Sequence, residues 1–356
     1  DVFQSFVLFA GAFIILYGLI QYLPGGMGET LTELKSTGKL NALDFGAGLD
    51  VVTGAWAGII GMALFHMTVY GSNQMMVQRT LASKNIGDAK KSYLLMGYFA
   101  PVIYFLFVLM GVLFYKYYGG QEFENDNTII LKFAADYGLP GLMGIIAAAV
   151  MAASMSSLSA AFHSLSTIST LDFYQRYFRR DETPEHYLKV TRFFTVFWAF
   201  MIVMPAILYS KSGGSILEVL SKVGSFFVGA QLGMYALGFF SKHATERGLL
   251  VGTAVGFGMV AYVYFFTSIA WPWYCLIGAA TNFIVSTLAS LVIDGRQKEW
   301  SPFTIKGQKE RFRSEGLPEK DGNWYLVPGK MDKVSWSLLV YFIAVIAFLA
   351  FFEDFF

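Results

Sequence analysis

Nine apolar runs divide this chain, and each is close to the length that crosses a lipid bilayer. A transmembrane helix needs about 20 predominantly apolar residues. The runs occupy 2–23, 51–78, 92–118, 139–172, 187–209, 214–240, 247–268, 272–294 and 335–353. The connections between them are mostly short, so a soluble domain with its own core has little room. The pattern predicts an all-α integral membrane protein with nine transmembrane helices.

The composition supports the same fold class. Only 14% of the 356 residues are charged and 55% are hydrophobic, whereas soluble domains carry about 25% charged residues. A net charge of +1 without a basic stripe argues against a nucleic-acid partner. The single cysteine, Cys275, excludes an intramolecular disulfide and a zinc cluster. The expected partners are therefore the lipid bilayer and a small molecule.

The distribution of lysine and arginine predicts the orientation in the membrane. Counted from the first run, the second, fourth, sixth and eighth connections hold 19 of the 26 basic residues. These connections, including the long loop 295–334, are expected to be cytoplasmic, and the C-terminus is expected outside. Trp271, Trp273 and Tyr274 adjoin an outer connection, which predicts an aromatic belt at the membrane interface. We expect residues 1–356 to form one multi-pass domain of the plasma membrane.

The fourth run carries small and polar residues at helical spacing. Ala153, Ser156, Ser157 and Ala160 recur every three or four residues, so a helix would place them on one face. Hydroxyl groups are disfavoured against lipid, so this face should point into the protein. One interpretation is close helix packing, with hydroxyls bonded to the preceding turn. The other is a site for a hard cation, to which hydroxyl and carbonyl oxygens are suitable ligands.

Four motifs carry a family resemblance. Residues 73–84 (NQMMVQRTLASK) are similar to the NQ-x-x-x-QR-x-LA-x-K segment of the sodium/solute symporter family, which includes the sodium–glucose cotransporters. Residues 155–174 resemble that family's MSSL…STI-x-T-x-DIY helix. Residues 1–4 resemble the TD-x-x-Q opening of its fifth core helix, and residues 241–248 fit the loop after its tenth. The motifs follow the family's order and cover essentially the whole chain.

The resemblance implies a LeuT-type fold, in which two inverted five-helix repeats contain discontinuous helices. The nine runs would be core helices five to ten and three trailing helices, so a leading helix and core helices one to four are expected to be missing. The family's sodium ligands would fall at the Ala153 carbonyl and the Ser156 and Ser157 hydroxyls. A second sodium ion, bound by some members, would use Asp1 and Ser159. Ala160 departs from that pattern, because a further serine would help there.

Substrate positions carry over less well. His66 and Tyr70 align with places where sugar-transporting members have an asparagine and a gating aromatic pair, and Ser221 aligns with a glutamine position. These departures put a galactose-like specificity in doubt. His66 and Tyr70 remain candidates by location, although an intramembrane histidine can equally be a structural hydrogen-bonding residue.

The resulting hypothesis is a sodium-coupled symporter that imports a small polar solute by alternating access, with Na⁺ as the co-transported ion. A sugar or polyol is the first choice, and an organic anion such as a monocarboxylate, sialic acid or vitamin is the alternative. A membrane enzyme would need paired carboxylates, a metal cluster or an activated nucleophile, and the intramembrane acids are few and unpaired. A sensor on the same fold would need an attached signalling domain.

Overall fold

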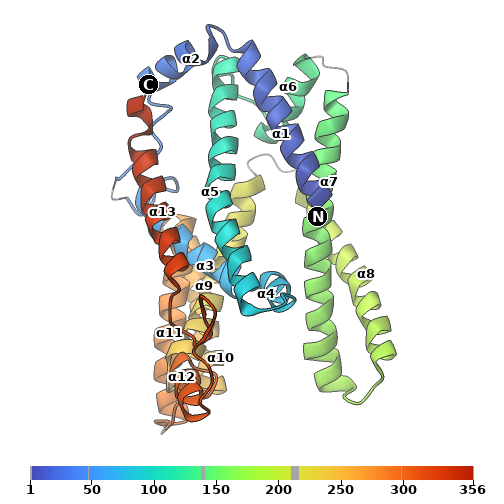
Figure 1. Cartoon of the computed structure of the whole chain (residues 1–356), viewed down its shortest axis with the longest axis vertical. Helices are drawn as coiled ribbons and strands as arrows, with labels where there is room; N and C mark the ends of the chain where they lie inside the picture. Colours follow the sequence, from blue (N-terminus) through green and yellow to red (C-terminus); the bar gives the residue numbers. More distant parts are fainter. Residues whose placement is uncertain (1, 47, 138–140, 210–215, 298, 356) are drawn as a thin grey trace. The chain divides into compact units, whose positions relative to one another are not determined.

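The computed structural model describes residues 2–46, 48–137, 141–209, 216–297 and 299–355, and most of them are helical (Figure 1). Within these residues, eight helices are long and apolar enough to cross a membrane. They are α1 (Val2–Tyr22), α5 (Ile86–Tyr117), α7 (Leu142–Thr167) with the π-helix η3 (Ile168–Phe178), α8 (Pro184–Tyr209), α9 (Ile216–Phe240), α10 (Glu246–Phe266), η4 (Trp271–Trp273) with α11 (Tyr274–Ile293), and α13 (Lys333–Ala350). Eight of the nine predicted runs therefore form spanning helices, and the chain is a multi-pass membrane protein.

The remaining run, 51–78, is discontinuous. It consists of the π-helix η1 (Ala57–Met62), α3 (Ala63–Gly71) and α4 (Gln74–Leu81). Asn73 separates the last two because its backbone is extended, with φ −69° and ψ 127°, and its side chain accepts a hydrogen bond from the Met75 amide. An asparagine favours such an N-cap because its side-chain oxygen replaces a missing helical acceptor. The apolar length of this run is thus divided between the continuous stretch η1–α3 and the separate short helix α4.

The chain divides into two compact units. The first comprises residues 1–34 and 107–216. In it α1 packs on α7, and α7 packs on α8. Close approach of α1 depends on glycine, since a Cβ at Gly11 would lie 3.3 Å from the Ala149 Cβ. The short elements that follow α1 and α5 are α2 (Gly26–Ser36), η2 (Asp126–Thr128) and α6 (Ile129–Tyr137).

The second unit comprises residues 35–106 and 217–356, and α10 and α11 form its most extensive helix pair. Glycines of α10 face polar residues of α11 at four-residue spacing. A Cβ at Gly252 would lie 1.9 Å from the Ser286 Oγ and 2.5 Å from the Ser286 backbone nitrogen. Asn282 is fully buried beside them and donates to the Ala230 carbonyl of α9 at 2.7 Å. These three helices are therefore joined through backbone contact and a buried amide.

The predicted loop 295–334 contains ordered structure. It includes α12 (Ile305–Ser314) and a two-stranded antiparallel hairpin of β1 (Lys320–Asp321) and β2 (Trp324–Tyr325). Lys90 of α5 donates to the Asp332 carboxylate at 2.6 Å and to the Tyr325 carbonyl at 2.7 Å. Asp332 is 1% exposed and accepts from the Tyr325 amide at 2.6 Å. The hairpin, α5 and the start of α13 are thereby held together. The short helix η5 (Phe352–Phe355) follows α13.

Pro184 is the first residue of α8, and the Thr183 hydroxyl accepts from the His186 amide at 3.3 Å. A proline at the first helical position after a threonine cap is a common helix start. The predicted interfacial belt is wrong, because Trp271, Trp273 and Tyr274 are buried. Trp271 and Tyr274 pack in a cluster with Val260 and Val263 of α10. A tryptophan near a connection can thus fill a protein interior as readily as a membrane interface.

Candidate functional site

The predicted cation residues lie on α7, an α-helix that is continuous from Leu142 to Thr167. Alanine is the most frequent residue of its first half, and alanine has the highest helix propensity. Because the helix is unbroken at Ala153, the carbonyl of that residue already accepts the usual bond from the residue four positions later. A cation there would use the second lone pair of the carbonyl oxygen.

The exposure of the α7 residues is uneven. Ala153 and Ser156 are half-buried, and Ser157 is exposed. Met151 and Met155 of the same helix are 59% and 57% exposed. The Ser157 hydroxyl is therefore not consumed by close packing within the described chain, which leaves it accessible to a ligand or another segment.

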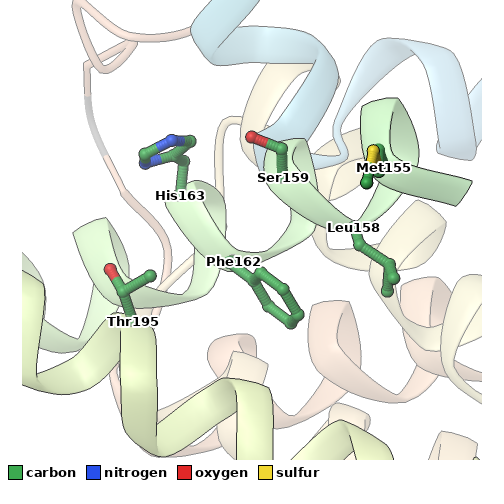
Figure 2. A pocket seen from close by; sticks show the side chains of 6 residues that line it. All are labelled: Met155, Leu158, Ser159, Phe162, His163 and Thr195. Carbon is green, nitrogen blue, oxygen red and sulfur yellow. The ribbon is translucent and has the colours of Figure 1, made fainter. Parts of the chain in front are cut away.

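A cavity of about 380 Å³ lies between α7 and α8 in the first unit. Its lining is Met155, Leu158, Ser159, Phe162 and His163 of α7 with Thr195 of α8. Ser159 and His163 extend from the same side of α7, one turn apart, whereas Leu158 and Phe162 extend from another side (Figure 2). The structure thus places Ser159 at a cavity with a histidine, and the described lining includes neither Ser156 nor Ser157.

The proposed second sodium site is only partly covered by the structure. Asp1 lies outside the described residues, so its relation to Ser159 is not defined. One turn after Asp1, the Gln4 Oε1 atom is buried and has no hydrogen-bond partner among the described residues. Gln4 belongs to α1, the helix that packs on α7. A buried amide oxygen without a partner is costly and is a suitable cation ligand. Gln4 is part of the motif at residues 1–4, but the sequence resemblance indicated a sodium ligand only at Asp1.

Several other hydroxyls of this region serve packing. Ser164, Ser166 and Thr170 are buried. The Ser166 hydroxyl donates to the His163 carbonyl at 3.2 Å, and the Thr170 hydroxyl accepts from Thr191 of α8 at 3.1 Å. Trp198 of α8 donates to the Ser169 hydroxyl at 2.9 Å. The hydroxyls at residues 164–170 therefore serve packing, and the cation-site interpretation of Ser156 and Ser157 stays a prediction.

The candidate solute residues His66 and Tyr70 lie one turn apart on α3, in the second unit. Their rings are stacked, with centroids 5.5 Å apart and planes inclined by 14°. The His66 Nδ1 atom is buried and has no hydrogen-bond partner among the described residues. A buried nitrogen of this kind is expected to bind a ligand or an ordered water. The structure therefore brings these two predicted residues together and leaves one buried nitrogen without a described partner.

Ser221 belongs to α9 and is half-buried. A Cβ at Gly224, one turn further along α9, would lie 3.5 Å from the Phe65 Cζ, and Phe65 precedes His66. Seven residues further along both helices, Gln231 donates to the Ser72 carbonyl at 3.2 Å. Residues of α9 therefore lie close to Phe65, the neighbour of His66, and to Ser72, which directly follows α3. Ser221 lies one turn before Gly224 on α9.

The described part of the chain contains no cluster of the side chains that usually bind transition metals. Within it, no group of three or more His, Cys, Asp or Glu residues is placed to hold a metal ion. The polar atoms that the structure does offer are hydroxyls, carbonyls, an amide oxygen and an imidazole. Discontinuous membrane helices such as α3 and α4 are typical of the binding sites of secondary transporters.

Comparison with known proteins identifies the family. The profile of the sodium:solute symporter family matches residues 1–256, which is more than half of the chain. The chain belongs to this family, as the four motifs predicted. The fold resembles that of a solved Na⁺-coupled sialic acid symporter with a TM-score of 0.71 and 22% identity, covering 84% of this chain and 62% of that one. The predicted LeuT-type fold is confirmed, and the family is one of transporters rather than enzymes.

The names of the curated relatives refer to different substrates. The human sodium/glucose cotransporter 4 is 31% identical over 59% of this chain and 34% of its own length. The human sodium-coupled monocarboxylate transporter 1 is 27% identical over 74% of this chain and 44% of its own. The Vibrio parahaemolyticus sodium/glucose cotransporter is 24% identical over 74% of this chain and 52% of its own length. The chain therefore spans between a third and about half of the length of these relatives.

Proposed function

We infer that this chain is part of a sodium-coupled symporter that imports a small polar organic solute. The observation that carries this function is the Ser156–Ser157 pair on α7, inside the family match, with the Ser157 hydroxyl exposed rather than packed. The Ala153 carbonyl and these two hydroxyls supply sodium ligands. Ser159 contributes to a second ion together with Asp1, and the buried Gln4 oxygen is a further ligand for it.

The solute binds at α3 and α9 of the second unit. The stacked pair of His66 and Tyr70 offers an aromatic surface, and the unpartnered His66 nitrogen offers a polar contact. A sugar or polyol suits this combination, since hydroxyl groups bond to an imidazole and sugar faces pack on aromatic rings. Ser221 adds a hydroxyl one turn from Gly224. An organic anion such as a monocarboxylate, sialic acid or vitamin is the second candidate, because relatives with such names share the family.

Sodium entry supplies the driving force for import. One positive charge moving through about 100 mV releases about 2.3 kcal/mol. A tenfold concentration gradient of the ion adds about 1.4 kcal/mol. Together these sustain a solute gradient of several hundredfold per sodium ion. Linkage requires that sodium and solute strengthen each other's binding by the same factor.

The orientation follows from the basic connections. Residues 295–334 face the cytoplasm, the C-terminus faces outward, and the protein resides in the plasma membrane. A cysteine placed at Lys309 on a Cys275→Ser background should resist an impermeant thiol reagent in intact cells. Its modification there would contradict this orientation.

The sodium site is tested by Ser157→Ala in the full-length protein. The change removes one of about five sodium ligands and barely alters the side-chain volume, so expression should stay near normal. We expect the apparent sodium affinity to fall at least about tenfold, or about 1.4 kcal/mol. Sodium dependence is measured by thermal stability of the purified protein in NaCl and in choline chloride.

Two control variants separate the interpretations. Ser154→Ala removes another exposed hydroxyl of α7 outside the ligand positions, and should leave sodium affinity unchanged. Ser164→Ala removes a buried hydroxyl and reports on packing. Equal losses of sodium affinity in Ser157→Ala and Ser164→Ala would favour general packing. An unchanged sodium dependence in Ser156→Ala and Ser157→Ala would contradict the proposed site.

A further inference from the structure

The break between α3 and α4 exposes backbone carbonyls that a continuous helix would satisfy. In a continuous helix the carbonyls of Tyr70 and Ser72 would accept from the amides of residues 74 and 76. The Met76 amide instead donates to the Asn73 carbonyl at 2.9 Å. Backbone groups without partners are costly at membrane depth, so a break persists only where other groups satisfy it.

Side chains from two other helices satisfy these carbonyls. The Tyr93 hydroxyl of α5 donates to the Tyr70 carbonyl at 3.0 Å. The Gln231 amide of α9 donates to the Ser72 carbonyl at 3.2 Å. Both donors and both acceptors belong to the second unit. The hydrogen-bonding capacity of these two carbonyls at the break is therefore used by protein side chains.

Tyr93 also contacts the other side of the break. The Thr80 hydroxyl of α4 lies 2.9 Å from the Tyr93 hydroxyl. One phenol thus connects the last turn of α3 with the last turn of α4. A single hydroxyl that bonds to both half-helices fixes the angle between them more firmly than either bond alone.

Tyr93 and Gln231 are next to residues that are themselves held by tertiary contacts. Lys90, one turn before Tyr93 on α5, forms the buried ion pair with Asp332. Ala230, the neighbour of Gln231, accepts from the fully buried Asn282 of α11. The two donors are therefore fixed by contacts that do not involve α3 or α4.

We propose that Tyr93 and Gln231 are positioning residues that brace the helix break and thereby set the solute-binding rings of Tyr70 and His66. The Tyr70 residue whose carbonyl is held by Tyr93 is the one whose ring stacks on His66. Holding its backbone fixes the direction in which the ring leaves the helix. This role deepens the proposed function and rests on it for the identity of the solute residues.

The brace itself is tested by amide hydrogen exchange of the full-length protein, without any solute. Tyr93→Phe removes the hydroxyl and keeps the ring, and Gln231→Met removes the amide and keeps the length. We expect amides of residues 71–81 to exchange about fivefold faster in each variant, the factor that corresponds to one hydrogen bond of about 1 kcal/mol. Tyr98→Phe is the matched control, since this α5 phenol bonds to Ser337 of α13. It should leave residues 71–81 unchanged.

Exchange that is unchanged at residues 71–81 in both variants would overturn the brace. A rise of equal size in α10 and α11 would also overturn it, since that pattern indicates general loosening. Because this measurement requires neither sodium nor solute, its result is independent of whether the protein transports anything.

The positioning role is tested by uptake into proteoliposomes. Radiolabelled D-glucose, L-lactate and N-acetylneuraminate are the probes, and the first that shows sodium-dependent uptake is used. We expect Tyr93→Phe to raise the solute KM about fivefold with little change in half-saturating sodium or in maximal rate. An unchanged KM, or an equal shift in the sodium and solute constants, would contradict positioning. If no probe is taken up, the proposed substrate classes fail, and the exchange experiment alone decides the brace.

Discussion

Two stripes of small residues in this protein have different surroundings. On α10 in the second unit, Gly248 and Gly252 face α11 so closely that a Cβ would collide, and a Cβ at Gly256 would lie 3.2 Å from the Asn282 Cβ. On α7 in the first unit, Ala153, Ser157 and Ala160 recur every three or four residues, yet Ser157 is exposed. Small residues at helical spacing therefore indicate close approach, but the approaching group can be another helix or a ligand.

The two units also satisfy their buried polar groups differently. The second unit encloses Asn282, Ser286 and Ser290 completely, and the Ser286 hydroxyl donates to the Asn282 carbonyl oxygen at 2.7 Å. In the first unit, η3 and α8 are joined by single hydroxyl contacts, such as that of Thr170 with Thr191. A dense polar and glycine interface specifies one geometry, whereas isolated hydroxyl bonds between membrane helices are individually weak.

The largest expected effect concerns the dense interface. Gly252→Ala would place a Cβ 2.5 Å from the Ser286 nitrogen, and the backbone there cannot move without separating α10 from α11. We expect a loss of about 3 kcal/mol, the upper end of typical overpacking costs, seen as a lower Tm and poor yield of the purified protein. Gly258→Ala on the same helix is the control, since nothing lies within 4 Å of its Cβ. Comparable decreases of the Tm in both variants would show that the close contact of Gly252 with Ser286 does not cause the destabilisation.

An intermediate effect is expected at the polar end of the second unit. Asp332→Asn removes the partner of Lys90, an ammonium that is 28% exposed. Breaking a buried pair costs about 3–5 kcal/mol, and partial access of Lys90 to water reduces this to about 2 kcal/mol. Glu319→Gln breaks the exposed contact with Lys330 and should hardly change the Tm. An equal change in both variants would show that burial of Asp332 adds nothing.

The same ion pair has a predictable pH dependence. Burial alone raises the pKa of Asp332, but the Lys90 ammonium and the Tyr325 amide outweigh burial and hold this pKa below its ordinary value. A carboxylate with a depressed pKa stabilises the fold above its unfolded pKa of about 3.9 and loses that contribution as the pH falls through the folded value. The Tm difference between wild type and Asp332→Asn should therefore be constant near pH 6–8 and shrink below about pH 4. A difference that grows on acidification would contradict this assignment.

The smallest expected effect lies in the sparse interface of the first unit. Trp198→Phe removes the indole nitrogen that donates to the Ser169 hydroxyl and retains most of the ring. Hydrogen bonds between membrane helices average about 0.6 kcal/mol, so the Tm should fall only slightly. Thermal unfolding in detergent measures the change, with Trp336→Phe of α13, an exposed tryptophan, as the control. A loss as large as that of Gly252→Ala would mean that the two interfaces are equally critical.

The sequence alone determined the membrane class, eight of the spanning helices and the family. These follow from properties that are local in the chain, namely apolar length, short motifs and the spacing of small residues. The start of α8 at Pro184 was also predictable, because proline and the preceding threonine act on their own helix end. The grouping of Ala153, Ser156 and Ser157 near one face of α7 is likewise a consequence of helical periodicity.

The tertiary structure decided which small and polar residues touch one another. Sequence periodicity could not show that Trp271 and Trp273 lie in the interior, because aromatic runs with the same sequence pattern occur at membrane interfaces and in protein cores. It could not reveal that Tyr93 and Gln231 meet the carbonyls of Tyr70 and Ser72, since these partners are 23 and 159 positions apart. Such contacts depend on how separate helices pack, and packing is determined by the whole unit rather than by any one segment.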